Sequence, residues 1–213
     1  MDLSHLVFDL DNTLYAPTSG VVERVDELIT AFMVERLDMT PIEADALRAR
    51  YREELGTTLN GLMRDHAVSP DEYLTYVHAV EIEELLGPDA ALLTMLRALP
   101  HDKLIFTNGS SAHAERVLAC LGVRGCFVDV YSLERVAYVP KPERAAFESL
   151  LCEIDVPAAR CLLIDDRVDN LRAAGTLGMR TLLVGSAVIP SGIDIAVESI
   201  IDLPTALRVV GAS

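Results

Sequence analysis

The first apolar run of the sequence, HLVFDLDNTL, ends in two aspartates that lie two residues apart, Asp9 and Asp11. If extended geometry continues to Asp11, both carboxylates point to the same side, because side chains alternate along a strand. Adjacent carboxylates repel each other unless a cation or a shared proton holds them. The pair therefore indicates a site that holds a cation or a proton. An acidic turn followed by an Asn-Thr cap would also explain the Asp11-Asn12 pair taken alone.

A second pair of acids, Asp165 and Asp166, follows another apolar run in CLLIDDRVDN, with Asn170 one helical turn beyond. Hard oxygen ligands of this kind select Mg2+, which accepts one or two carboxylates together with a substrate phosphate. A solvated acidic turn that caps a helix would explain one such loop, but not two at matching strand ends. We therefore expect a Mg2+ site, and we assign Arg167 and Asp169 to solvent or to local salt bridges.

Two other motifs offer groups that suit a phosphoryl substrate. In KLIFTNGS, the Thr107 hydroxyl and the backbone N–H groups at Asn108 and Gly109 can cradle a phosphoryl oxygen, although these residues are also an ordinary way to leave a strand. In VPKPER, the prolines on either side of Lys141 restrict the backbone and hold this lysine in place. Its ammonium can neutralise a phosphoryl group and the carboxylates around it. The alternative is a solvated surface lysine, and only the other motifs argue against it.

The motifs end short apolar runs that alternate with segments of helical period, a pattern typical of βαβ units and a parallel α/β sheet. We predict strands at His5–Asp9, Lys103–Thr107, Phe127–Tyr131, Cys161–Asp165 and Arg180–Val184, and an edge strand near Val197–Ile200. We predict helices at Ala112–Leu121, Glu143–Leu151 and Asp169–Leu177, with Gly122 and Gly178 as C-terminal stops. Ligands of open α/β sheets bind at the carboxyl ends of the strands, so we expect the site there.

Between Pro17 and Gly87 the strand signal disappears and apolar residues recur at helical spacing. The clearest series is Val21, Val25, Leu28, Ile29, Phe32, Met33 and Leu37. Ser69 followed by Pro70 is typical of a helix start, with serine as the N-cap and proline at the first helical position. We therefore predict a helical insert, which cannot lie in the sheet and must sit over one end of it.

The chain has 213 residues, with 18 Lys and Arg against 33 Asp and Glu and a formal net charge of −15. This length predicts one domain, or one domain with a smaller insert. The negative charge, without any basic run, argues against binding to nucleic acid or to an anionic membrane surface. No segment has the pattern of a signal peptide or of a membrane-spanning helix, so we expect a cytoplasmic protein.

The four cysteines never form a C-x-x-C pair and lie within or beside apolar segments. They are Cys120, Cys126, Cys152 and Cys161. This pattern favours buried free thiols in a reducing compartment over a metal site or a disulfide framework.

Taken in order, FDLDNT, FTNG, the lysine of PKPE and IDDRVDN resemble the four motifs of the haloacid dehalogenase superfamily of phosphohydrolases. The resemblance implies a Rossmann-like three-layer α/β/α core with a parallel sheet, formed by residues 1–15 and 89–213. It also implies a small helical cap, residues 16–88, inserted after the first strand. Dehalogenase members of the superfamily lack the second aspartate, so the presence of Asp11 favours phosphoryl transfer over cleavage of a carbon–halogen bond.

The resemblance also implies a role for each motif residue. Asp9 becomes the nucleophile that forms an aspartyl-phosphate, and Asp11 becomes the general acid and base. Mg2+ is the implied cofactor, held by Asp9, by the Asp11 backbone carbonyl and directly by Asp166, with Asp165 acting through a water molecule. Thr107 and Lys141 complete the catalytic group. The residues implied in phosphate binding are Leu10, Thr107, Asn108 and Lys141.

The segments YREELGTTLNGLMRDH, DEYLTYVHAV and FTNGSSAHAERVLACLG resemble the pyrimidine 5′-nucleotidase branch, whose members dephosphorylate nucleoside monophosphates. Arg167 departs from that branch, which usually has a serine there. The implied partner is a small-molecule phosphomonoester, and the chain is expected to be a monomer or a homodimer. A sugar-phosphate phosphatase, a phosphomutase and a non-catalytic binding protein remain alternatives.

Contacts to the leaving group are harder to assign. The candidates on the insert are Tyr51, Thr57, Thr58, Asn60 and His66, although polar residues on a helical insert more often form its solvated face. His113 and Arg116, on the helix after Thr107, are better explained as helix surface than as ligands.

Overall fold

A computed structural model describes residues 3–211, and within them it shows one sheet of six strands, all parallel to their neighbours. The strands are β1 His5–Phe8, β2 Asp102–Phe106, β3 Asp129–Tyr131, β4 Cys161–Asp165, β5 Arg180–Val184 and β6 Ile195–Val197. Their spatial order is β3-β2-β1-β4-β5-β6, with β1 in the middle. The predicted parallel α/β architecture is therefore confirmed.

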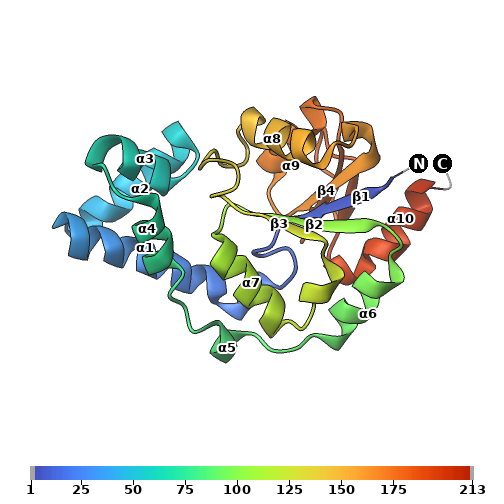
Figure 1. The fold of residues 1–213 in the computed structure, drawn as a ribbon, viewed down its shortest axis with the longest axis horizontal. Coiled ribbons are helices and arrows are strands. Elements are labelled where there is room, and N and C mark those ends of the chain that lie inside the picture. Colours follow the sequence, from blue (N-terminus) through green and yellow to red (C-terminus); the bar gives the residue numbers. More distant parts are fainter. Residues whose placement is uncertain (1–2, 212–213) are drawn as a thin grey trace. The chain divides into compact units, whose positions relative to one another are not determined.

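Helices cover both faces of the sheet (Figure 1). The helices α6 Ala90–Ala98, α7 Ser111–Cys120 and α10 Leu203–Gly211 lie on one face, and α8 Arg144–Ile154 and α9 Val168–Thr176 lie on the other. Leu6, Val7 and Phe8 of β1 have no exposed surface. A parallel strand that is buried on both sides reads as a continuous apolar run, which is why β1 shows no alternation.

The register of the central strands brings the two acid motifs to the same level. Phe8 of β1 lies opposite Ile105 of β2 and Ile164 of β4. The next residue, Asp9, therefore lies level with Asp165 at the carboxyl edge of the sheet, and its backbone N–H donates to the Ile164 carbonyl at 2.8 Å.

The ends of several elements follow the predicted chemistry. Gly122 and Gly178 adopt positive φ values of 71° and 88° just past α7 and α9, as expected for C-terminal stops. Ser69 caps α4, Pro70–Val77, by accepting from the Glu72 N–H. Both predictions are confirmed.

β1 and β2 differ from their predicted ranges by one residue, and the boundaries of two other strands were wrong by more. The strand predicted from Phe127 begins only at Asp129, because residues 124–126 form a 3-10 turn whose last hydrogen bond uses the Phe127 N–H. The edge strand lies at Ile195–Val197 instead of near Val197–Ile200, because Ser199 caps a second 3-10 turn, Ile200–Asp202.

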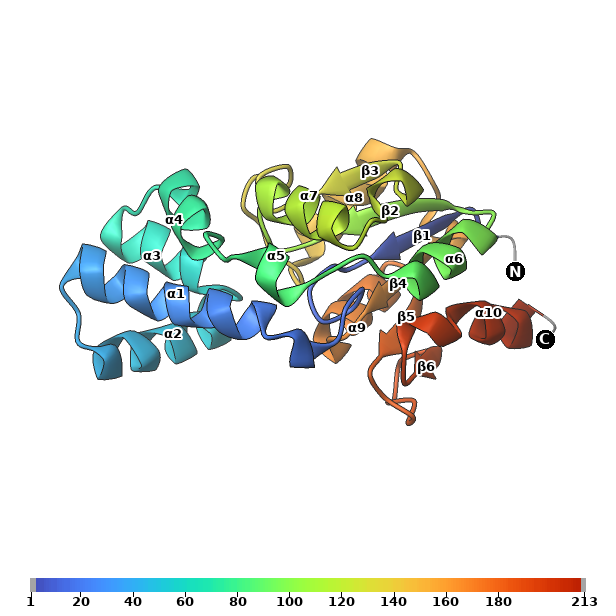
Figure 2. The same ribbon diagram turned by 90° about the horizontal axis from the view of Figure 1, so that it is seen from below.

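The chain divides into two compact units: one runs to Ala16 and resumes at Leu86, and the other is Pro17–Leu85. The second unit is helical, and its helices α1 to α4 pack together (Figure 2). It contains the 3-10 turn Pro17–Ser19 and the helices α1 Val21–Leu37, α2 Pro41–Leu55, α3 Thr58–His66, α4 and α5 Ile82–Leu85. Phe32 anchors its core, with ring centroids 5.2 and 5.3 Å from those of Tyr73 and Tyr76. Among residues 3–211, no helix combines the length and the apolar composition needed to cross a membrane.

Candidate active site

Lys141 joins three of the strand ends. Its side chain is 1% exposed, and its ammonium donates to Asp9 Oδ1 at 2.8 Å, to Asp165 Oδ2 at 2.8 Å and to the Phe106 carbonyl at 2.7 Å. An ammonium has three N–H donors, so these contacts use all of them. Lys141 is therefore a fixed, buried cation between two aspartates and not a solvated surface lysine.

Asp165 is fully buried and is held by more than Lys141. Its Oδ1 accepts from the Arg167 backbone N–H at 2.8 Å, and both of its oxygens lie 3.0 Å from the Asn170 amide nitrogen. Arg167 and Asp169 themselves are exposed, and Asp169 pairs with Arg172 at 3.8 Å. Asn170 therefore orients Asp165 through its amide group.

Asp9, Asp165 and Asp166 each place one carboxylate oxygen so that the three oxygens lie within 4.8 Å of one another. Burial raises the pKa of Asp9 to about 8, against the opposing attraction of Lys141, and the nearby Asp165 carboxylate adds to the rise. Burial and Asp165 likewise raise the pKa of Asp166 to about 6. Burial acts to lower the pKa of Lys141, but the carboxylates of Asp165 and Asp9 outweigh it and raise that pKa.

This donor set fits Mg2+. It consists only of carboxylate oxygens, which a hard divalent cation prefers, and it offers more negative charge than Lys141 alone neutralises. A bound cation would favour the ionised forms of Asp9 and Asp166, whose pKa values are raised without it.

Asp11, whose charge adds to the rise in the pKa of Asp9, has hydrogen-bond partners of its own. The Tyr15 hydroxyl donates to its Oδ1, and His113 Nε2 lies 2.9 Å from the same oxygen. Burial, followed by the Asp11 charge, raises the pKa of Tyr15, so its hydroxyl keeps its proton. His113 is 1% exposed, so its assignment to the helix surface was wrong, whereas Arg116 is half-buried. For the contact between Tyr15 and Asp11, the sequence offered only a weak signal, namely that Tyr15 lies four residues after Asp11.

The remaining core residues predicted for the site play distinct parts. Thr107 is 1% exposed and its Oγ1 accepts from the Gly109 N–H at 2.9 Å. The Asn108 amide bonds the backbone of Lys141 on both sides, accepting from its N–H at 2.8 Å and donating to its carbonyl at 2.9 Å. The Leu10 side chain is fully buried, so only its backbone can face a ligand. Thr13, not singled out from the sequence, donates to Asp9 Oδ2 at 3.3 Å.

The leaving-group candidates on the helical unit are mostly engaged within it, and two of them do not form a solvated face. Tyr51 has no exposed surface and donates to Asp65 at 2.9 Å, and Thr58 is 5% exposed. Thr57 caps α3, and the Asn60 amide donates to the Leu55 carbonyl at 3.2 Å. His66 is exposed.

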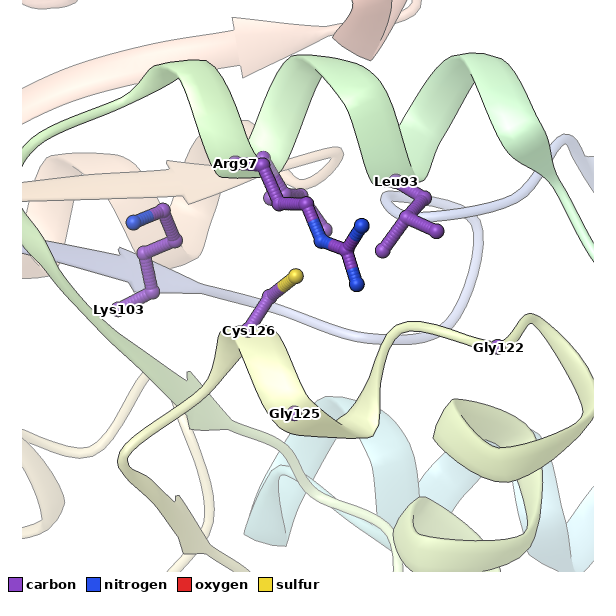
Figure 3. Close-up of a pocket in the computed structure, with 7 residues that line it drawn as sticks. Leu93, Arg97, Lys103, Gly122, Gly125 and Cys126 are labelled. Carbon is purple, nitrogen blue, oxygen red and sulfur yellow. The ribbon is translucent and has the colours of Figure 1, made fainter.

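A cavity of about 340 Å³, which none of the predicted site residues lines, lies beside α6 (Figure 3). Its lining residues are Leu93, Leu96, Arg97, Lys103, Gly122, Gly125 and Cys126. The Lys103 ammonium is already committed, because it donates to the carbonyls of Leu99 and His101 at 2.7 Å each, at the end of α6. The Lys103 ammonium is therefore not available to bind a ligand in this cavity.

All four cysteines are free thiols, but the prediction that they are buried holds fully only for Cys161. Cys120 and Cys126 are half-buried and Cys152 is exposed. Cys152 lies on an exposed position of α8, which the apolar residues around it in the sequence did not reveal.

Comparisons with known proteins extend this picture. The chain is similar to Phosphate metabolism protein 8 of Saccharomyces cerevisiae, with 27% identity over 187 residues, covering 81% of this chain and 58% of that protein. It thus spans little more than half the length of that relative.

Two solved structures show the same fold. One is a 2-haloacid dehalogenase from Pseudomonas syringae, with a TM-score of 0.63, 20% identity and coverage of 98% of this chain and 99% of that one. The other is a HAD phosphatase from Thermococcus onnurineus, with a TM-score of 0.61, 19% identity and 98% coverage of both chains. The family model described as haloacid dehalogenase-like hydrolase matches residues 3–178. With its fold and its motif order, the chain belongs to the haloacid dehalogenase-like hydrolase family.

Proposed function

We propose that this hydrolase cleaves phosphomonoesters and that Asp9 is its nucleophile. The observation that carries the proposal is the pairing of Asp9 with the buried Lys141 ammonium, beside the carboxylates of Asp165 and Asp166. A carboxylate nucleophile splits one hard displacement into two easier ones. The fixed positive charge of Lys141 stabilises the negative charge of the transferring phosphoryl group.

The reaction has two steps. In the first, an Asp9 carboxylate oxygen attacks phosphorus in line, the bond from phosphorus to the leaving oxygen breaks, and Asp11 gives its proton to that oxygen. In the second, Asp11 takes a proton from water, which attacks phosphorus and releases inorganic phosphate and Asp9. Asp11 suits this task because its carboxyl group is partly exposed, with 27% of its side-chain surface accessible.

Asp9 and Asp166 would hold Mg2+, with the Asp11 backbone carbonyl and Asp165 in support. When bound, Mg2+ supplies charge neutralisation for the phosphoryl oxygens and for the clustered carboxylates. Lys141 and Thr107 bind the remaining phosphoryl oxygens. Asn108 contributes by fixing the backbone of Lys141, to which its amide is bonded on both sides.

A specific residue favours phosphatase over dehalogenase activity. Dehalogenation needs no acid to protonate a departing halide, whereas expulsion of an alkoxide from a phosphomonoester does, and Asp11 provides that acid. The name of the yeast relative refers to phosphate metabolism. The dehalogenase from Pseudomonas syringae is only 20% identical to this chain, so the similarity supports a shared fold and not a shared reaction. The reaction is argued from the residues of the site.

We further propose that the substrates are nucleoside 5′-monophosphates, with pyrimidines preferred, and that the helical unit, Pro17–Leu85, selects the leaving group. The support is the sequence resemblance of this unit and of α7 to the pyrimidine 5′-nucleotidase branch. Sugar phosphates remain the competing substrates, and a phosphomutase would need a second sugar acceptor.

The proposal is tested by phosphate release from UMP, CMP, dTMP, AMP, GMP, ribose 5-phosphate and glycerol phosphate, with Mg2+ and with EDTA. We expect Mg2+-dependent release that is concentrated on the pyrimidine nucleotides. Equal release from sugar phosphates would overturn the nucleotide assignment but keep the phosphatase. Failure to hydrolyse any of these compounds or a generic aryl phosphate would favour a binding protein.

A further inference from the structure

Two buried side chains grip the Asp11 carboxyl group from separate parts of the chain. Tyr15 is 8% exposed and His113 is 1% exposed, and both bond Asp11 Oδ1, the histidine from 102 positions further along the sequence. Asp11 itself remains partly exposed, with 27% of its side-chain surface accessible. The carboxyl group is thus anchored through Oδ1 by two buried side chains while part of its surface faces solvent.

The turn after β1 supplies the first contact. Within this turn Thr13 donates to Asp9 Oδ2 at 3.3 Å, and Tyr15 donates to Asp11. Each aspartate therefore receives one hydroxyl from a residue four positions further on. The Leu14 N–H bonds the Leu10 carbonyl at 3.0 Å, which closes the turn and brings these hydroxyls back over the aspartates.

The start of α7 supplies the second contact. Ser110 caps the helix by accepting from the His113 N–H at 3.2 Å, which places His113 in the first turn. Gly109 makes room for the ring: a Cβ at this position would lie 3.3 Å from His113 Cδ2, 3.2 Å from Thr107 Oγ1 and 3.6 Å from Asp11 Oδ2. The loop that carries Thr107 and the ring that reaches Asp11 are therefore packed against each other.

We propose that Tyr15 and His113 are positioning residues that hold the Asp11 carboxyl group where it exchanges its proton with the leaving oxygen. This role rests on the proposed function, in which Asp11 is the general acid. A general acid must lie within hydrogen-bond reach of the oxygen that it protonates. A carboxyl group on a single-bonded side chain rotates, and two hydrogen bonds to one of its oxygens stop that rotation.

The test uses leaving-group basicity, which a merely structural role would not follow. Phenyl phosphate and 4-nitrophenyl phosphate have similar shapes, but only phenolate needs protonation to leave readily. The ratio kcat/KM covers the steps up to expulsion of the leaving group, so it isolates the acid step. The variants are His113→Met, which removes the donor, His113→Gln, which keeps an N–H near the position of Nε2, and Tyr15→Phe. Asp11→Asn is the reference, and Tyr131→Phe, at a buried tyrosine of β3, is the control.

We expect His113→Met and Tyr15→Phe to lower kcat/KM for phenyl phosphate by about tenfold or more, and for 4-nitrophenyl phosphate by less than about threefold, because general acid catalysis contributes 10² to 10⁴. His113→Gln should retain more activity than His113→Met, and Tyr131→Phe should match the wild type on both substrates. Equal losses on the two substrates, or no loss on either, would overturn the positioning role.

The same experiment separates a failure of the phosphatase proposal from a failure of the positioning role alone. If the wild type hydrolyses neither these esters nor any compound of the substrate panel above, the phosphatase proposal fails and this inference fails with it. If Asp11→Asn shows the expected leaving-group dependence while the folded Tyr15→Phe variant does not, only the positioning role fails. Thermal melting of each variant establishes folding, and Tyr15→Phe, which removes a single oxygen, decides the matter if His113→Met does not fold.

Discussion

At the scale of single residues, the site depends on one buried cation between two buried acids. Lys141 bonds Asp9 and Asp165 at 2.8 Å each, while Asp165 takes further hydrogen bonds from Asn170 and from the Arg167 backbone. Removing one partner of a buried ion pair leaves the other charge without compensation, which is more costly than removing both.

Lys141→Met should therefore abolish measurable phosphate release and lower the free energy of unfolding by about 3 kcal/mol, because Asp9 and Asp165 are left facing each other. Urea denaturation and a phosphate-release assay measure the two effects. The matched control is Lys103→Met, at a buried lysine whose ammonium donates to the carbonyls of Leu99 and His101. That variant should lose stability and keep its turnover. Normal turnover in Lys141→Met would contradict the charge role of this residue.

Residue types and order predicted which acids and which lysine gather at the site, because each ends an apolar strand or lies in a restricted loop. The contact of His113 with Asp11 was missed, because a histidine on a helix is assigned to the surface unless its partner from a distant part of the sequence is known. Thr13 and Tyr15 were missed because a turn brings them back to Asp9 and Asp11, and helical or strand periodicity does not describe that geometry.

At the scale of elements, the site is built by strand register and by loops that bond one another. The β1–β4 register sets Asp9 level with Asp165, and Asn108, just after β2, bonds the loop before α8 through the backbone of Lys141. The loops that carry the second and third motifs therefore hold each other in place.

Asn108→Ala should release the Lys141 backbone, because it removes the acceptor of the Lys141 N–H and the donor to its carbonyl. We expect faster amide hydrogen exchange around Lys141 and a fall in kcat of about tenfold, the change produced by a loss of about 1.4 kcal/mol in transition-state stabilisation. Exchange in α9 should stay unchanged and serves as the internal control. Unaltered exchange at Lys141 together with normal kcat would contradict this coupling.

Element positions were predictable where apolar runs are continuous and bounded by clear signals. The limits of β4 and β5 match the predicted residues, and Ser69, Gly122 and Gly178 act at helix ends as expected. The boundaries of β3 and β6 were wrong because 3-10 turns lie beside these strands, at Arg124–Cys126 and Ile200–Asp202. The second turn contains no glycine or proline, and Gly125 in the first does not mark where β3 begins.

At the scale of the whole molecule, a chain with a net charge of −15 concentrates part of its negative charge in a buried cluster. The pKa values of Asp9 and Asp166 are raised to about 8 and about 6 from a usual value of 3.8. Between the usual pKa of 3.8 and the raised pKa of about 8, the folded protein binds more protons than the unfolded chain. Its stability therefore falls as the pH rises through this range. Below the usual value both states are protonated and this penalty disappears.

Without metal, we therefore expect a higher melting temperature at about pH 6 than at about pH 8, because ionising Asp9 and Asp166 in the fold costs free energy. Mg2+ should raise the melting temperature more at the higher pH, since it binds the ionised carboxylates. Differential scanning calorimetry with EDTA and with Mg2+ measures both effects. Asp9→Asn, which removes the carboxyl group whose folded pKa of about 8 makes it ionise in this window, should flatten the metal-free dependence. A metal-free stability that rises across this window would contradict the account of the cluster.

The most direct test of the nucleophile is to trap the phosphoryl group on Asp9. The variant is Asp11→Asn, supplied with Mg2+ and 4-nitrophenyl phosphate. The 4-nitrophenolate of this substrate leaves without an acid, but the variant lacks the base for the second step. The aspartyl-phosphate should therefore accumulate. Acid quenching, digestion and mass spectrometry should then find one phosphoryl group on the peptide that contains Asp9 and none when Asp9 is also changed to asparagine. Release of 4-nitrophenol without any phosphoryl group on that peptide would contradict the mechanism.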